Sequence, residues 1–238
     1  MGPDFSILVV TAASIGFVHT ITGPDHYLPF IAIGRARKWS LGKTLSVTAL
    51  CGAGHVLGSI ALGLVGIGLG LAVGKLDVIE GIRGDLAAWL LISFGLIYGI
   101  WGLRKAVTGR PHTHAHTHAD GTNHHHSHTH VSGHAHPHVD EKSARSITPW
   151  ALFIIFVLGP CEPLIPILMY PAANHSLVGL FGVAAVFSLV TIATMVGMVV
   201  LAERGIKLLP IRGLERYAHA LAGLAIFSSG LAIQFLGL

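Results

Sequence analysis

The sequence predicts an all-α polytopic membrane protein that crosses the bilayer six times. Of its 238 residues, 52% are hydrophobic and only 11% are charged, whereas about 25% of the residues in a soluble domain are charged. Apolar runs of about 20 residues, the length that crosses a hydrocarbon core about 30 Å thick, recur along the chain. A transmembrane β-barrel would show short segments of alternating hydrophobicity instead.

Six apolar segments lead to that count, and two of them are interrupted. The expected membrane segments cover residues 5–33, broken near 23; 43–73; 84–103; 147–172, broken near 160; 177–201; and 215–237. The N-terminus lacks the basic stretch of a signal peptide, so it is expected to open the first helix. Both cysteines fall inside apolar segments, so no disulfide framework is expected.

Basic residues are distributed unevenly among the connections. Thirteen of the 15 lysines and arginines lie in 35–43, 104–145 and 204–216. Because basic loops stay in the cytoplasm, we expect these connections to be cytoplasmic and both termini to lie outside the inner membrane of a prokaryotic cell. The net charge of +4 is explained by this orientation and does not indicate a nucleic-acid partner.

The connection between the third and fourth segments is rich in histidine. It shows no apolar periodicity, so residues 104–146 are expected to form a disordered cytoplasmic loop. Its repeated His-x-His spacing suits Ni²⁺, Cu²⁺, Co²⁺ or Zn²⁺, which predicts an auxiliary metal-binding loop. Its twelve candidate ligands are His112, His114, His116, His118, His124, His125, His126, His128, His130, His134, His136 and His138.

The two interrupted segments share one dipeptide. Gly23-Pro24 and Gly159-Pro160 lie 136 residues apart, and Pro163 follows the second pair closely. Proline lacks the N–H that continues a helix, and the neighbouring glycine relaxes the backbone further. The first helix of each half is therefore expected to break there and to leave carbonyl groups without intrahelical partners.

The same offset relates the two halves of the chain. It places the second segment on the fifth and the third on the sixth, so residues 1–103 and 147–238 are expected to be three-helix repeats. Because each repeat crosses the membrane an odd number of times, the second repeat is inverted. Inverted repeats with matching broken helices are typical of transport proteins whose binding site lies near the bilayer midplane.

Ionisable residues gather at the two breaks. Asp25 and Glu162 are the acids that lie directly at the breaks, and no lysine or arginine lies deep enough in the expected segments to pair with them. A carboxylate in lipid without a partner costs about 3 kcal/mol or more. A bound cation or a proton is therefore expected as the counter-charge.

Nitrogen and sulfur ligands accompany these acids. His19 precedes His26 by seven residues, and Cys51 precedes His55 by four, so each pair is expected on one helix face. Imidazole, thiolate and carboxylate together suit a borderline divalent transition metal, because Ca²⁺ and Mg²⁺ prefer oxygen ligands alone. The candidate metal ligands are His19, Asp25, His26, His55, Cys51, Cys161 and Glu162.

The pattern His19-x5-Asp25-His26, with His55 on the next segment, resembles the nickel/cobalt transporter family. The stretch Gly-Pro-Cys-Glu-Pro at 159–163 and the three-plus-three layout resemble the wider lysine-exporter superfamily, including its urease-accessory-like six-helix membrane proteins. This resemblance implies a secondary transporter of Ni²⁺ or Co²⁺, with Zn²⁺ as a further candidate cargo. The long His-rich loop resembles that of the exporter branch and so favours efflux over import.

Two other functions stay open at the level of sequence. A thiol-disulfide electron conductor of the same superfamily would need Cys51 and Cys161 to meet, and a non-transporting metal sensor would act through the His-rich loop. No hydrolase constellation or nucleotide-binding motif is present, so no enzyme activity and no resident cofactor are expected. The expected partners are the metal ion and the lipid bilayer, and a homodimer is compatible with the sequence.

Overall fold

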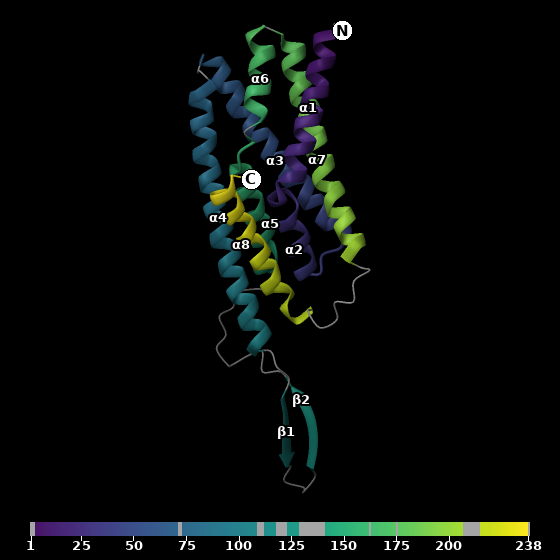
Figure 1. Ribbon diagram of the computed structural model, residues 1–238. Coiled ribbons are helices and arrows are strands. Elements are labelled where there is room, and N and C mark those ends of the chain that lie inside the picture. The colour runs from purple at the N-terminus through teal and green to yellow at the C-terminus, as the bar shows by residue number, and fades with distance from the viewer. Residues whose placement is uncertain are drawn as a thin grey trace.

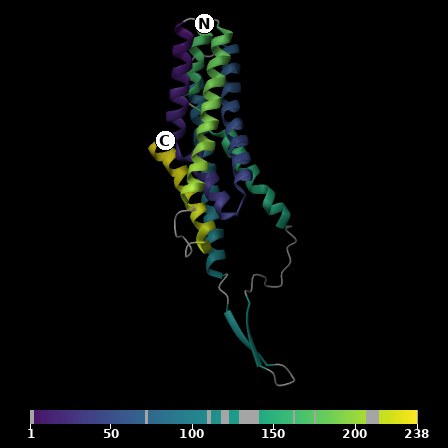
Figure 2. The ribbon, with the colours of Figure 1, turned by 90° about the vertical axis from the view of Figure 1, so that its right-hand side faces the viewer.

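The structure is a computed structural model of the whole chain, and it is helical over most of its length. It describes residues 3–70, 73–108, 112–117, 123–128, 141–161, 163–174, 176–206 and 215–237. The helices form an elongated bundle with the N-terminus at one end, and the C-terminus lies about halfway along its length in both ribbon views (Figure 1 and Figure 2).

The first expected segment breaks where its proline predicts. Helix α1 spans Pro3–Thr22, a single 3-10 turn η1 spans Pro24–His26, and α2 spans Leu28–Ala36. Pro24 has no N–H to donate into α1. Farther along the chain, the Tyr27 hydroxyl donates to the carbonyl of Ile21 (3.2 Å) and so satisfies one of the groups that the break exposes.

Two long helices follow the first break. Helix α3 spans Leu41–Gly68, and Ser40 caps it by accepting a hydrogen bond from the backbone N–H of Lys43 (3.3 Å). Helix α4 spans Val73–Thr108. It begins well before the expected segment 84–103, because the residues ahead of 84 continue the helix despite their charges.

Within the His-rich connection, residues 112–117 and 123–128 form a β-hairpin. Strand β1 spans His112–Thr117, and β2 spans Asn123–His128; they pair antiparallel with His112 opposite His128. Figure 1 shows the hairpin beyond one end of the helical bundle. In these two segments cross-strand pairing satisfies the backbone groups without any apolar face. The disorder expected for 104–146 stays a prediction.

The second expected break is also present. Helix α5 spans Glu141–Leu158, and α6 spans Leu164–Ala173, with Gly159 and Pro160 between them. Helix α7 (Leu177–Ile206), a 3-10 turn η2 (Glu215–Tyr217) and α8 (Ala218–Leu236) complete the described chain.

Five helices of the described chain are long and apolar enough to span a membrane, one fewer than the six segments expected. They cover Phe5–Thr22, Leu41–Gly68, Gly74–Thr108, Leu177–Gly205 and Glu215–Leu236. The remaining expected segment is split between α5 and α6, whose apolar parts, Thr148–Leu158 and Leu164–Ala173, are each shorter. The break at Gly159-Pro160 accounts for the difference.

Two buried clusters hold the bundle together, one on each side of the breaks along its length. The first surrounds Phe30, Phe156 and Met195, and it includes Cys51. The second surrounds Leu168 and Phe187 and includes Cys161. Each buried aromatic or large aliphatic side chain contributes about 1.5–3 kcal/mol in water, but inside a bilayer dense packing takes over that role.

Helices α4 and α8 pack closest together. At Gly99 and Gly223 the two backbones approach so nearly that Gly223 has no room for a Cβ atom. Gly95 faces the backbone of Phe227 in the same way. Small residues at a membrane helix interface allow this approach and strengthen van der Waals contact between backbones, so the last helix is held firmly along α4.

Candidate metal site

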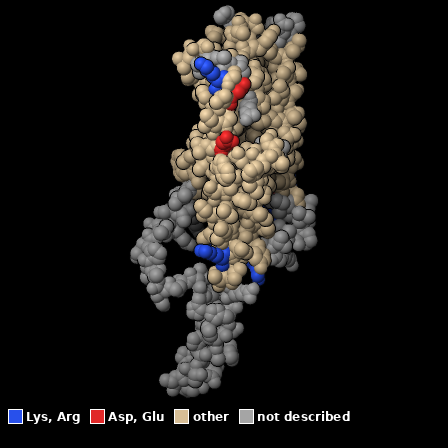
Figure 3. All heavy atoms as spheres, turned by 60° about the vertical axis from the view of Figure 1, so that its left-hand side comes forward, with Lys and Arg blue, Asp and Glu red and all other residues tan. Residues whose placement is uncertain are grey.

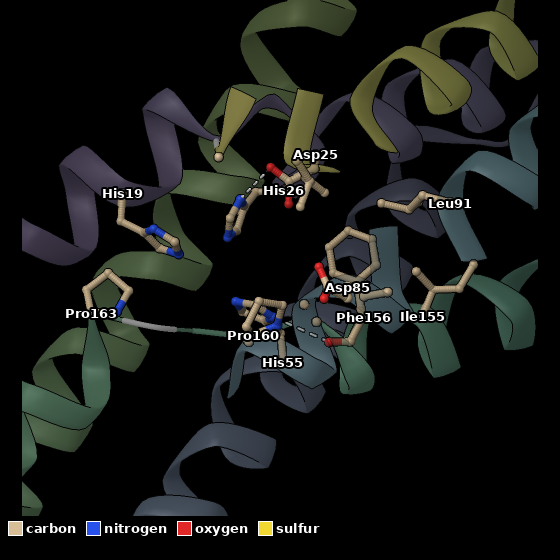
Figure 4. A pocket seen from close by; sticks show the side chains of 16 residues that line it. His19, Asp25, His26, His55, Asp85, Leu91, Ile155, Phe156, Pro160 and Pro163 are labelled. Carbon is tan, nitrogen blue, oxygen red and sulfur yellow. Dashed lines mark hydrogen bonds and ion pairs between the residues drawn. The ribbon is translucent and has the colours of Figure 1, made fainter. Parts of the chain in front are cut away.

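Three histidines from three separate elements meet at the first break. His19 lies in the last turn of α1, His26 ends the 3-10 turn, and His55 lies in the middle of α3. One ligand nitrogen from each lies within 4.8 Å of the others. The ring centroids of His19 and His26 are 4.7 Å apart, and those of His26 and His55 are 5.1 Å apart. Figure 4 shows the three rings around a common space.

The Nε2 atoms of this cluster have no hydrogen-bond partner in the part of the chain that the structure describes. Those of His19, His26 and His55 are all buried, and none makes a hydrogen bond to a described residue. The His26 and His55 side chains are almost fully enclosed, with relative exposures of 4% and 3%. A buried polar atom without a partner is costly, so three of them in neighbouring rings indicate room for a ligand.

The opposite ring nitrogens fix the imidazole tautomers. The Nδ1–H of His55 donates to the carbonyl of Phe156 (3.3 Å), and that of His26 donates to the carbonyl of Gly23 (3.1 Å). A carbonyl oxygen can only accept, so in each ring Nδ1 carries the proton and Nε2 keeps its lone pair. Metal-binding histidines are oriented in this way by a second hydrogen bond.

The local backbone explains why the cluster forms at this point. In an unbroken helix, His19 and His26 would be stacked two turns apart on one face. The 3-10 turn after Gly23 folds His26 back, so that its ring meets that of His19 edge to face. The predicted break therefore brings the two rings together rather than separating them.

Asp25 lies beside the cluster and orients one of its rings. Its Oδ1 is 3.2 Å from Nδ1 of His26, and its side chain also lines the cavity (Figure 4). The three histidines lie close enough together to share a metal ion. The Asp25 carboxylate lies on the Nδ1 side of the His26 ring. A carboxylate behind a histidine strengthens the ring as a ligand.

The other predicted ligands lie elsewhere or outside the described chain. Cys51 is fully buried in the first cluster one turn from His55, and Cys161 is fully buried in the second cluster. Glu162 lies outside the described residues. Of the loop histidines, the structure describes only the backbone of those in β1 and β2; those outside the described residues are His118, His130, His134, His136 and His138.

A cavity of about 320 Å³ opens next to the histidines. Both breaks contribute to its wall, because Gly159, Pro160 and Pro163 line it together with the three histidines. The two Gly-Pro breaks, which are far apart in the sequence, therefore border one space.

An arginine at the second break was missed by sequence reasoning. The guanidinium of Arg83 donates from Nη2 to the carbonyls of Val157 (2.9 Å) and Gly159 (3.3 Å) and from Nη1 to Glu80 (2.6 Å). The expectation that no basic residue reaches the breaks is wrong, because α4 extends beyond the predicted segment and carries both members of this ion pair. Their i, i+3 spacing was the available signal.

Comparisons of the chain with models of known protein families, with curated proteins and with solved structures find no match.

Proposed function

We propose that the protein is a secondary transporter of divalent transition-metal ions, with Ni²⁺ or Co²⁺ as the cargo and Zn²⁺ as a further candidate. The observation that carries this proposal is the set of three buried Nε2 atoms of His19, His26 and His55, none of which has a hydrogen-bond partner among the described residues. They lie at a helix break in a chain whose long apolar helices suggest an integral membrane protein.

The ligand chemistry supports a transition metal as the cargo. Imidazole nitrogen suits Ni²⁺, Co²⁺ and Zn²⁺, whereas Ca²⁺ and Mg²⁺ are bound by oxygen. Three protein ligands leave positions open on the ion, which suits a site that must release what it binds. Asp25 behind His26 supplies a negative charge that offsets part of the charge of the ion.

The arrangement of helices supports a transporter built from inverted repeats. In this proposal α1 with α2, and α5 with α6, are the broken first helices of two repeats, and each pair crosses the membrane once, which makes six crossings. Helix α3 contacts α7 and α4 contacts α8, so the second and third helices of each repeat meet their counterparts. Such self-paired contacts are expected across a pseudo-two-fold axis in the membrane plane.

The orientation follows from the basic residues. We place both termini outside the inner membrane and the hairpin of β1 and β2 in the cytoplasm, in accordance with the positive-inside rule. Efflux is favoured because a His-rich segment on the cytoplasmic side would collect ions for export. The resemblance of His19-x5-Asp25-His26 to the nickel/cobalt transporter signature agrees with this assignment.

The competing functions draw less support from the described residues. A thiol-disulfide conductor needs its cysteines to exchange, yet Cys51 and Cys161 are buried in different packing clusters. A sensor acting through the hairpin would not require a metal-ready cluster inside the bundle.

Elemental analysis of whole cells tests the proposal. Cells that produce the wild-type protein and cells that produce the His26→Gln variant are compared after Ni²⁺, Co²⁺ or Zn²⁺ supplementation, at equal amounts of membrane-inserted protein. We expect the wild type alone to change the cellular content of at least one metal, a decrease indicating efflux and an increase import. Equal contents for all three metals would contradict the proposal.

A further inference from the structure

The cavity beside the three histidines extends along α4 to an exposed acid. Asp85 lines the same cavity as the histidines, and its side chain is exposed. Gly81, Gly84 and Asp85 follow one another at i, i+3 and i+4, so they share one face of α4. Along that face the wall of the cavity runs from the second break to the carboxylate.

The end of α8 borders this opening. Helix α8 ends at Leu236, and Gly237 closes it in the left-handed conformation at φ 66°. Ile233 and Gly237 line the cavity, and both ribbon views place the C-terminus about halfway along the bundle (Figure 1 and Figure 2). Helix α4 continues past this level toward the end of the bundle that holds the N-terminus, so its cavity-lining face is not covered there by α8.

Two polar side chains meet at this opening. Gln234 donates from its Nε2 to Oδ1 of Asp85 (3.3 Å), and its own Oε1 is buried with no hydrogen-bond partner among the described residues. The Gln234 amide therefore holds the Asp85 carboxylate where it lines the cavity. This carboxylate is an acceptor that can hold the water shell of a cation.

The surroundings of Asp85 show that water must reach it. On the face shown in Figure 3, most of the described surface is uncharged, with few charged atoms between its two ends. An exposed carboxylate in contact with lipid hydrocarbon is costly by about 3 kcal/mol. Asp85 lines the cavity that the three histidines also line, and water in that cavity would remove this cost.

We propose that this cavity is the hydrated access route between the three histidines and the side of the membrane that holds the N-terminus, and that Asp85 is a cation-docking residue on its wall. This inference rests on the proposed transport function. The ion, still hydrated, passes Gly81, is attracted by the Asp85 carboxylate and exchanges water for the Nε2 atoms of His19, His26 and His55. In efflux the same path is travelled in reverse.

The glycines on α4 keep the route open. A Cβ added to Gly81 would meet no described atom within 4 Å, so this position borders open space. At Gly84 a Cβ would lie 3.0 Å from Pro160 Cγ, so this glycine lets the second break pack against α4. A leucine at 81 is therefore expected to fit without disturbing the fold and to fill the passage.

Chemical labelling tests whether water reaches Asp85 in the cavity. Asp85→Cys and Leu86→Cys are compared in intact cells with a charged, membrane-impermeant thiol reagent, and the parent protein, with its two buried cysteines, gives the background. We expect Asp85→Cys to react several-fold faster than Leu86→Cys, whose exposed side chain lies outside the cavity lining, and Ni²⁺ to slow the reaction. If Asp85→Cys fails to insert, Gly81→Cys replaces it. Equal, slow labelling of the cavity cysteine and Leu86→Cys would overturn the route.

Flux measurements in reconstituted vesicles test the role of the carboxylate. Asp85→Asn is expected to lower the initial rate of Ni²⁺ transport several-fold and to weaken its dependence on ionic strength, because the steering charge is lost. Its Ni²⁺-induced thermal stabilisation at saturation should be retained, since the three histidines are intact. A rate equal to the wild type at low ionic strength would overturn the docking role.

A matched pair of glycine variants tests the path itself. Gly81→Leu should reduce flux strongly, whereas Gly74→Leu, two turns earlier on the same helix and also in open space, should transport as the wild type does. Normal flux in Gly81→Leu would overturn the route.

The proposed function fails separately from this inference. A wild-type protein that shows neither Ni²⁺ flux nor Ni²⁺-induced stabilisation contradicts transport itself. An active wild type with normal Asp85→Asn and Gly81→Leu variants contradicts this inference alone.

Discussion

The guanidinium of Arg83 donates a hydrogen bond to the carbonyl of Gly159 at 3.3 Å, so the second helix break holds a cation that belongs to the protein. A second bond from the same group reaches the carbonyl of Val157. At the first break, by contrast, three histidine nitrogens have no hydrogen-bond partner within the described segments. The two breaks are alike in sequence but differ in chemistry: carbonyls of the second accept hydrogen bonds from an internal side chain, whereas the first lies beside histidines that could hold a metal ion.

Replacing Arg83 is expected to destabilise the protein. Arg83→Met removes the donors for both carbonyls and the partner of the Glu80 carboxylate, which is only 1% exposed. Breaking a buried ion pair from one side costs about 3 kcal/mol or more, so the midpoint of thermal unfolding in detergent should fall by several degrees.

A double variant controls for the ion pair. Glu80→Gln combined with Arg83→Met removes the buried charge as well, and it should unfold at a higher temperature than Arg83→Met alone. An Arg83→Met protein as stable as the wild type would show that the hydrogen bonds to Val157 and Gly159 contribute nothing to the fold.

Asp25 and His26 are expected to respond differently to substitution. His26→Gln removes a ligand nitrogen and should abolish both Ni²⁺ flux and Ni²⁺-induced thermal stabilisation. Asp25→Asn leaves the three Nε2 atoms in place and removes only the charge behind His26. It should weaken metal affinity by about 10–100-fold, the usual effect of losing a group that orients a ligand.

Isothermal titration of the purified variants with Ni²⁺ separates these roles. An Asp25→Asn protein with no measurable binding would make the carboxylate a direct ligand. Unchanged affinity would instead leave the contact between Asp25 and His26 without a function in metal binding.

Much of this site could be predicted from the sequence, because its main determinants are local. Pro24 and Pro160 cannot continue a helix, so both breaks were visible in the chain, and the histidines next to the first break stood out in an apolar segment. The meeting of His26 and His55 followed from the resemblance to a known signature, and the structure brings the rings together.

The sequence-based expectations failed where contacts between helices determine the structure. The ends of α4 could not be read from hydropathy, since a charged pair such as Glu80 and Arg83 lowers the average and yet continues the helix when it is paired. The burial of Cys51 and Cys161 in separate packing clusters depends on which helices pack together, and no spacing along the chain indicates that.

The cysteines are expected to be dispensable. Cys51→Ala and Cys161→Ala each remove a thiol from a packed cluster and cost some stability, on the order of 1–3 kcal/mol if the cavity stays open. Neither should abolish Ni²⁺ flux under saturating metal. Loss of flux in Cys51→Ala, with normal insertion and a normal response of Cys161→Ala, would point to the thiolate as a ligand; loss in both would favour thiol-disulfide chemistry.

Opposite ends of the bundle are expected on opposite sides of the membrane. Asn174 is exposed at the end of α6, and Thr108 is exposed at the end of α4 next to the hairpin. A cysteine at 174 should react with an impermeant thiol reagent in intact cells, and one at 108 should react only after the cells are opened. The reverse pattern would contradict the orientation inferred from the basic residues.

The His-rich segment is expected to bind metal independently of the cluster in the bundle. An imidazole ordinarily takes up a proton near pH 6.5, and only the neutral ring can ligate, so metal binding by the segment should be present at pH 7.5 and mostly lost near pH 5.5. In the full-length His26→Gln protein, bound Ni²⁺ measured by elemental analysis therefore reports this segment. A second protein, in which the twelve loop histidines are also replaced by serine, provides the baseline. If both proteins hold the same amount of Ni²⁺ at pH 7.5, the segment is not a metal-binding loop. A third protein carries the serine replacements in an otherwise wild-type chain. If its Ni²⁺ flux equals that of the wild type at low and at high Ni²⁺ concentration, the His-rich segment does not collect ions for transport.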